Sequence, residues 1–173
     1  RTIERLVKTL KYRFVPESGM DIGELMAMCI EPKLPHMGIT PLNTVLMPIP
    51  LHPRRLRWRG FNQAELIARE VARCLEFPLV TNMIIRTRHS KPQADIKDRE
   101  SRIKNAQGLF ALSPSDSPLS IRGSAKGVVA FRDRETILLI DDLSTTGSTL
   151  NEAARVLKTA GAKEVIGFVF ARG

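Results

Sequence analysis

This sequence contains few of the residues that hold metal ions or cross-link a chain. Its 173 residues include only two cysteines and three histidines, and no C-x-x-C spacing occurs. That scarcity argues against a structural zinc site and against a disulfide framework. We therefore expect Cys29 and Cys74 to be buried free thiols, as in proteins of the reducing cytoplasm.

Long apolar runs and the common nucleotide-binding fingerprints are also missing. No hydrophobic stretch approaches the roughly 18–20 residues of a membrane-spanning helix. The segment Arg1–Arg5 contains an acid and begins no signal peptide. Neither G-x-x-x-x-G-K-[ST] nor G-x-G-x-x-G occurs, which excludes P-loop and dinucleotide-binding motifs. Aromatic residues are scarce, and this weakens the case for direct stacking on single-stranded DNA.

The most informative segment of the chain begins with four aliphatic residues, 137–140, which are typical of a buried parallel strand. Asp141 and Asp142 follow, and then comes a small, hydroxyl-rich loop that runs into a helix. Backbone N–H groups at a helix N-terminus bind phosphate, while paired carboxylates can accept hydrogen bonds from neighbouring sugar hydroxyls. The segment therefore predicts a site for a ribose 5-phosphate.

The order of the expected elements is that of an α/β protein. Strands are expected at 44–47, 79–85, 108–112, 137–140 and 165–170, and helices at 2–13, from 21, at 62–75 and after 147. This alternation predicts a mainly parallel central sheet flanked by helices, with the loops after Met47 and Ile140 at the same edge. We expect one domain, 1–173, with an N-terminal helical segment 1–43, a core 44–173 and a mobile loop at about 113–127.

Positive charge is concentrated in two segments. Residues 51–59 carry four arginines and no acid, and residues 86–104 carry seven basic and three acidic residues. Together they supply eight of the nine net positive charges. Such focusing favours an anionic ligand between the segments or a nucleic-acid face, although solvated surface loops would have the same composition.

These motifs resemble those of a known family. Asp141-Asp142 followed by Thr145-Thr146-Gly147-Ser148-Thr149 resembles the phosphoribosyl-diphosphate (PRPP) motif of type I phosphoribosyltransferases. The segments 48–55 and 59–64 resemble the ComF-type (competence protein F) branch of that superfamily, as does Gln93 followed by Arg99 and Asn105. The resemblance implies the phosphoribosyltransferase type I fold with its flexible hood.

The resemblance also implies roles for particular residues. Asp141 and Asp142 would contact the ribose hydroxyls, partly through water and a Mg²⁺ ion that has no direct protein ligand. The implied 5-phosphate loop comprises Leu143, Ser144, Thr145, Thr146, Gly147, Ser148 and Thr149. The implied pyrophosphate loop comprises Leu51, His52, Arg54 and Arg55, and the implied hood residues are Arg86, Arg88, Lys91, Gln93 and Arg99.

Three functions remain open from the sequence. The first is a Mg²⁺-dependent transfer of the phosphoribosyl group to a nitrogenous acceptor. The second is a non-catalytic sugar-phosphate sensor, and the third is a competence factor that binds single-stranded DNA or DNA-uptake proteins. A homodimer is compatible with each. Many ComF-type proteins carry an N-terminal zinc ribbon, which we expect to be absent here.

Overall fold

A computed structural model describes residues 17–88, 105–114, 120–121, 129–130 and 136–172. Its centre is a parallel sheet with the strand order β1 (Thr44–Pro48), β6 (Thr136–Ser144), β7 (Glu164–Arg172). Met47 lies opposite Leu139, which in turn lies opposite Gly167. The backbone of Leu46 also bonds to Pro78 and Val80, so a short extended segment continues the sheet beyond β1. The predicted α/β class and parallel sheet are confirmed.

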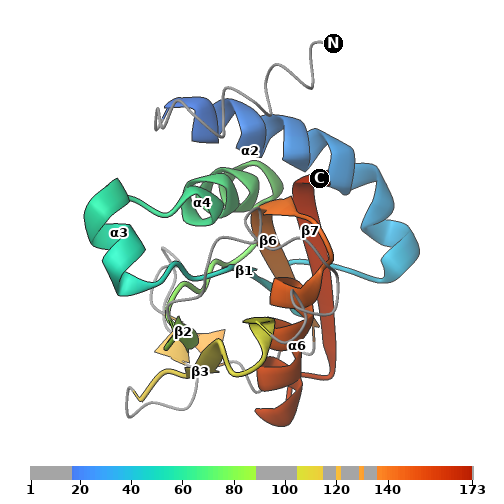
Figure 1. The fold of residues 1–173 in the computed structure, drawn as a ribbon. Helices are drawn as coiled ribbons and strands as arrows, with labels where there is room; N and C mark the ends of the chain where they lie inside the picture. Colours follow the sequence, from blue (N-terminus) through green and yellow to red (C-terminus); the bar gives the residue numbers. More distant parts are fainter. Residues whose placement is uncertain (1–16, 89–104, 115–119, 122–128, 131–135, 173) are drawn as a thin grey trace.

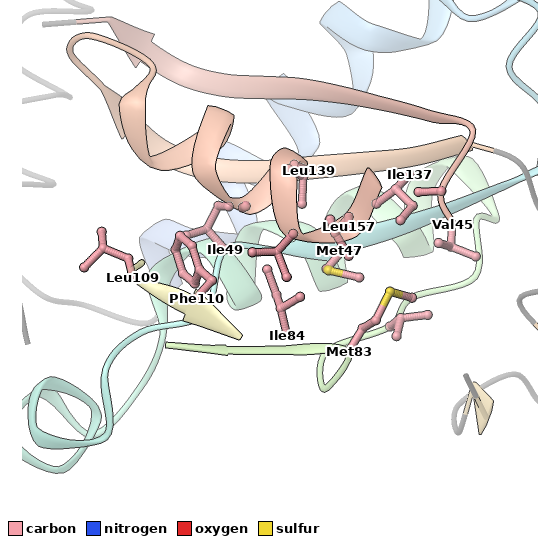
Figure 2. Close-up of a cluster of buried hydrophobic side chains, with 14 of the residues drawn as sticks. Val45, Met47, Ile49, Met83, Ile84, Leu109, Phe110, Ile137, Leu139 and Leu157 are labelled. Atoms are coloured by element: carbon pink, nitrogen blue, oxygen red, sulfur yellow. The ribbon is translucent and has the colours of Figure 1, made fainter. Parts of the chain in front are cut away.

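Both faces of this sheet are covered, which explains why residues 45–47 of β1 and 137–140 of β6 are all apolar. Leu138 and Ile140 point into a cluster formed with helices α2 (Glu17–Ile30) and α4 (Gln63–Leu75). Ile137 and Leu139 point into the opposite cluster, formed with α6 (Ser148–Thr159). Figure 1 shows α2 and α4 on one side of the sheet and α6 on the other, and Figure 2 shows the α6-side cluster.

A small antiparallel arm packs beside the sheet on the α6 side. It consists of β2 (Ile84–Arg86) and β3 (Phe110–Leu112), with Arg86 opposite Phe110. The expected strand 79–85 is therefore wrong as a single element. Thr81 and Asn82 are exposed in a bend, so the chain pairs with β1 before them and with β3 after them.

The connection between α2 and β1 is partly helical. It contains two short 3-10 helices, η1 (Glu31–Lys33) and η2 (Pro35–Met37), each of which begins at or next to a proline. Helix α2 begins at Glu17, earlier than the expected start at Asp21. The helix expected at 2–13 lies outside the described residues. Within the expected loop 113–127, a strand β4 (Ser120–Ile121) pairs with β5 (Val129–Ala130).

The packing of α2 on α4 buries a carboxylate and leaves both cysteines exposed. Glu70 is only 6% exposed. It packs on Gly23, where an added Cβ would lie 2.4 Å from the Glu70 Cβ, and Arg73 donates to its carboxylate. Cys29 and Cys74, which we expected to be buried, are exposed. Helical periodicity gave the elements but could not specify which side of each helix meets its neighbour.

No helix in the described part of the chain is long and apolar enough to cross a membrane.

Candidate functional site

The site is built on the second half of β6. We expected the strand to end at Ile140, but it continues to Ser144, and Asp141, Leu143 and Ser144 pair with β7. On the other side β1 has ended, and the N–H of Ile49 donates to the Ile140 carbonyl (2.9 Å) before the chain turns away. The two carboxylates therefore stand where β6 has lost one neighbouring strand.

The aspartate pair is held by its own backbone. The N–H of Asp142 donates to Oδ1 of Asp141 (3.0 Å), and the N–H of Leu143 donates to Oδ1 of Asp142 (2.8 Å). Burial and the neighbouring Asp142 raise the pKa of Asp141 well above its usual value, while Arg86 partly opposes this shift. A bound cation or a set of sugar hydroxyls would stabilise the ionised form of such a pair.

The expected 5-phosphate loop lies between β6 and α6, although Leu143 and Ser144 belong to the strand and Ser148 and Thr149 to the helix. Gly147, the N-cap of α6, has φ 76°, a left-handed conformation that favours glycine. Its N–H donates to Ser144 Oγ (3.1 Å), and the hydroxyls of Thr146 and Ser148 lie 2.9 Å apart. Hydroxyls thus surround a helix N-terminus, where the helix dipole favours an anion.

The expected pyrophosphate loop is largely a helix, α3 (Pro53–Arg59). Leu51 and His52 precede it, and His52 caps it by accepting from the Arg54 N–H at Nδ1 (3.2 Å). Proline at the first helical position and the cap explain why this arginine-rich segment is helical. Both flanks are tied to the sheet, because the Asn62 side chain donates to the Ile49 carbonyl (3.0 Å). Asn62 is also the N-cap residue of α4, and its side chain makes no capping hydrogen bond there.

The helical form of α3 divides its arginines into two groups. Arg54 and Arg57 are exposed, whereas Arg55 and Arg59, one turn apart, are half-buried. Burial lowers the pKa of Arg59, Asp142 raises it and Arg55 lowers it, so these three charges lie within electrostatic reach of one another. Arg59 was not among our predicted site residues. Its four-residue spacing from Arg55 would have identified it if the segment had been recognised as a helix.

Arg86 of β2 completes the charge cluster. Burial and the nearby Arg55 lower its pKa, and Asp141 opposes this effect. Its guanidinium lies over the Phe110 ring at 5.7 Å, which holds the side chain on the arm. Arg88 is exposed and donates to the Gln107 carbonyl (3.3 Å). The other predicted hood residues, Lys91, Gln93 and Arg99, lie outside the described residues.

The structure therefore brings together two carboxylates and three arginines from separate parts of the chain: Asp141, Asp142, Arg55, Arg59 and Arg86. This arrangement suits a ligand that has hydroxyls near one end and a strong anion near the other. Among the described residues, no cluster of three or more His, Cys, Asp or Glu side chains forms a metal cage. Two carboxylates do fit Mg²⁺, which is commonly held by one or two carboxylates, waters and substrate phosphates.

Comparisons with known proteins show the family of this chain. The model of the phosphoribosyl transferase domain matches residues 62–173, more than half of the chain. Competence protein F of Haemophilus influenzae is 33% identical over 126 residues, which cover 72% of this chain and 48% of that protein. Competence protein ComFC of Bacillus subtilis is 38% identical over 117 residues, covering 68% and 39% of the two chains. The DNA utilization protein YhgH of Salmonella typhi is 30% identical over 160 residues, covering 92% and 63%.

The chain belongs to the phosphoribosyl transferase domain family, and within it to the ComF-type branch. It spans about half the length of the curated relatives it matches.

Proposed function

We propose that this protein binds PRPP together with Mg²⁺ and transfers the phosphoribosyl group to a nitrogenous acceptor. The observation that carries the proposal is the position of the Asp141-Asp142 pair. The hydroxyl-rich N-terminus of α6 follows the pair along the chain, while Arg59 lies within electrostatic reach of Asp142, Arg86 of Asp141, and Arg55 of both arginines. These groups suit PRPP, whose ribose hydroxyls lie between a 5-phosphate and a 1-diphosphate.

The proposed transfer requires that the protein position its substrates and stabilise charge rather than form a covalent intermediate. Residues 145–149 would hold the 5-phosphate, and the two aspartates would orient the ribose through its 2- and 3-hydroxyls. The bond between C1 and the diphosphate oxygen breaks while the acceptor nitrogen bonds to C1, and negative charge grows on the departing diphosphate. Arg55, Arg59 and Arg86 would stabilise that charge. Mg²⁺, when bound, would neutralise the same charge.

Calorimetric titration with PRPP and Mg²⁺ tests the binding step. We expect wild-type protein to bind PRPP only when Mg²⁺ is present, and the double variant Asp141→Asn/Asp142→Asn to show no binding. Well-folded wild-type protein that binds no PRPP would refute the proposal. Release of pyrophosphate with a panel of nucleobases and amines then tests transfer. Binding without turnover would instead assign the protein as a non-catalytic sensor of PRPP.

A second candidate function rests on the outer side of α3. Trp58 is 78% exposed, and the exposed Arg54 and Arg57 lie on the same short helix. An exposed indole beside guanidinium groups is the combination that stacks on bases and contacts phosphates in single-stranded DNA. Relatives are named as competence and DNA utilization proteins. We propose that single-stranded DNA is a further ligand of this protein and that the protein acts in the cytoplasm.

Fluorescence anisotropy with a labelled oligonucleotide tests this second function. We expect affinity to fall steeply with salt and Trp58→Ala to weaken binding about tenfold, consistent with about 1–3 kcal/mol for one stacked base. Leu56→Ala, also exposed on α3, is the matched control. Equal effects of the two substitutions would argue against stacking on Trp58.

A further inference from the structure

Glu152 of α6 is a buried carboxylate that has no part in the chemistry proposed above. Its residue is 7% exposed. Oε1 accepts a hydrogen bond from the Gly108 N–H (2.8 Å), and Arg155 donates to both carboxylate oxygens (2.9 Å each). The bond to Gly108 joins two parts of the molecule that are 44 residues apart in the sequence.

On its own helix, Glu152 is fixed relative to the 5-phosphate loop. It lies four residues after Ser148, the first residue of α6, and therefore one turn from the loop. The helix is anchored below by Ala153, Val156 and Leu157, which belong to the core cluster on that side of the sheet. The Glu152 carboxylate is therefore held at a fixed position relative to the N-terminal end of α6.

On the other side, Gly108 fixes the arm that carries Arg86. Gly108 has φ 66°, and the next residue, Leu109, is buried in the same core as Phe110 and Ile84 (Figure 2). The Leu109 carbonyl accepts from the Thr87 N–H (2.9 Å). Phe110 pairs with Arg86 across the arm and lies under its guanidinium. A shift of Gly108 would therefore move Arg86 relative to Asp141.

We propose that Glu152 is a positioning residue that holds Arg86 at a fixed place relative to the 5-phosphate loop. The inference rests on the proposed function and identifies how the two anion-binding ends of the site are kept at the spacing of PRPP. Loss of the Gly108 contact should then weaken binding of the diphosphate end and leave the 5-phosphate end intact.

The ion pair with Arg155 is a separate contribution. Arg155 is one turn away on the same helix, and its side chain is 62% exposed. The Arg155 guanidinium faces solvent while the Glu152 carboxylate is buried, so water screens the pair on the arginine side and reduces its contribution. Arg155→Ala therefore removes the ion pair while leaving the acceptor of the Gly108 N–H in place, and it serves as the matched control.

Calorimetry of four proteins with two ligands tests the proposal: wild type, Glu152→Ala, Glu152→Gln and Arg155→Ala, each with Mg²⁺ and either PRPP or ribose 5-phosphate. We expect Glu152→Ala to weaken PRPP binding about tenfold and ribose 5-phosphate binding by less than about twofold. Glu152→Gln keeps an acceptor oxygen and should bind nearly as wild type, as should Arg155→Ala. Equal loss for both ligands, or equal effects of Glu152→Ala and Arg155→Ala, would overturn it.

Hydrogen exchange without ligand separates this inference from the proposed function. In Glu152→Ala we expect faster exchange at Thr87 and in β2–β3, with β1 and the 137–140 part of β6 unchanged. If Glu152→Ala does not fold, Glu152→Asp, which withdraws the carboxylate by one methylene, should show the same pattern to a smaller degree. Wild-type protein that binds no PRPP refutes the proposed function, whereas unchanged exchange in β2–β3 refutes the coupling.

Discussion

The two halves of β6 show how one strand serves both stability and function. Residues 137–140 are aliphatic, pair with β1 and β7 and are at most 1% exposed. In residues 141–144, Asp141, Leu143 and Ser144 pair with β7; all four residues are half-buried, and two of them are carboxylates. The first half gains free energy from apolar burial on both faces. The second half lacks much of that gain, and its open edge is what the proposed ligand site requires.

Removing a side chain from the apolar half, residues 137–140, should have the largest effect on stability. Leu138→Ala would leave a cavity between the sheet and helices α2 and α4, and we expect a loss of about 2–5 kcal/mol in the free energy of unfolding. Urea unfolding followed by circular dichroism gives the value. Leu143→Ala in the other half is the control and should cost clearly less, since Leu143 is only half-buried. Similar losses would mean that the two halves do not differ in packing.

Substitutions next to the open half, residues 141–144, should instead change the affinity for PRPP. Arg59→Ala removes a charge that lies close to Asp142, and we expect PRPP to bind about ten- to a hundredfold more weakly, in line with charge-assisted contacts. Calorimetry with Mg²⁺ present measures the change. Arg57→Ala removes an exposed arginine of the same helix and should change affinity much less. If both variants weaken binding equally, the effect comes from net charge and not from the division of α3 into two sides.

The substitution Asp141→Asn should raise the stability of the protein and lower its affinity for PRPP. Burial and the charge of Asp142 raise the pKa of Asp141 in the folded state above its unfolded value of about 3.9. The folded state therefore binds the proton of the Asp141 carboxyl more tightly than the unfolded state does. This tighter binding stabilises the fold below about pH 3.9, and the stabilisation is lost as the pH rises through the pKa of the folded state. At neutral pH the asparagine variant should be more stable, by about 0.5–2 kcal/mol, a typical gain for relieving a destabilised site.

Thermal unfolding of wild type and Asp141→Asn at pH 4 and pH 8 checks the sign. The advantage of the variant should grow between the two pH values, while its affinity for PRPP falls. An advantage of the same size at both values would show that Asp141 carries no destabilising charge.

Much of the core could be predicted from local sequence patterns. Four successive aliphatics at 137–140 indicated a strand covered on both faces, and the helix expected after Gly147 is α6. The handedness of the crossovers placed the loops after Met47 and Ile140 at the same sheet edge, but it did not predict that β1 and β6 are neighbours. In these places local propensity and tertiary packing favour the same structure.

The site was predicted less completely, because its members are brought together by tertiary packing. The Asp141-Asp142 motif identified one half of it. Arg59 was not predicted as a site residue because the segment that forms α3 was expected to be a loop. Pro53 directly after His52 nevertheless indicates the start of a helix. Glu152 has no motif at all, since its bond to Gly108 depends on how α6 meets the β2–β3 arm. The sequence pattern of one segment does not predict which residues of a distant segment it contacts in the folded protein.

The most direct test of the account is a crystal structure of the protein with PRPP and Mg²⁺. We expect the 5-phosphate at residues 145–149, the ribose hydroxyls at Asp141 and Asp142, and the diphosphate at Arg55, Arg59 and Arg86. Ligand bound away from the second half of β6, with these side chains unmoved and without contact to it, would contradict the assignment of that half as the PRPP site.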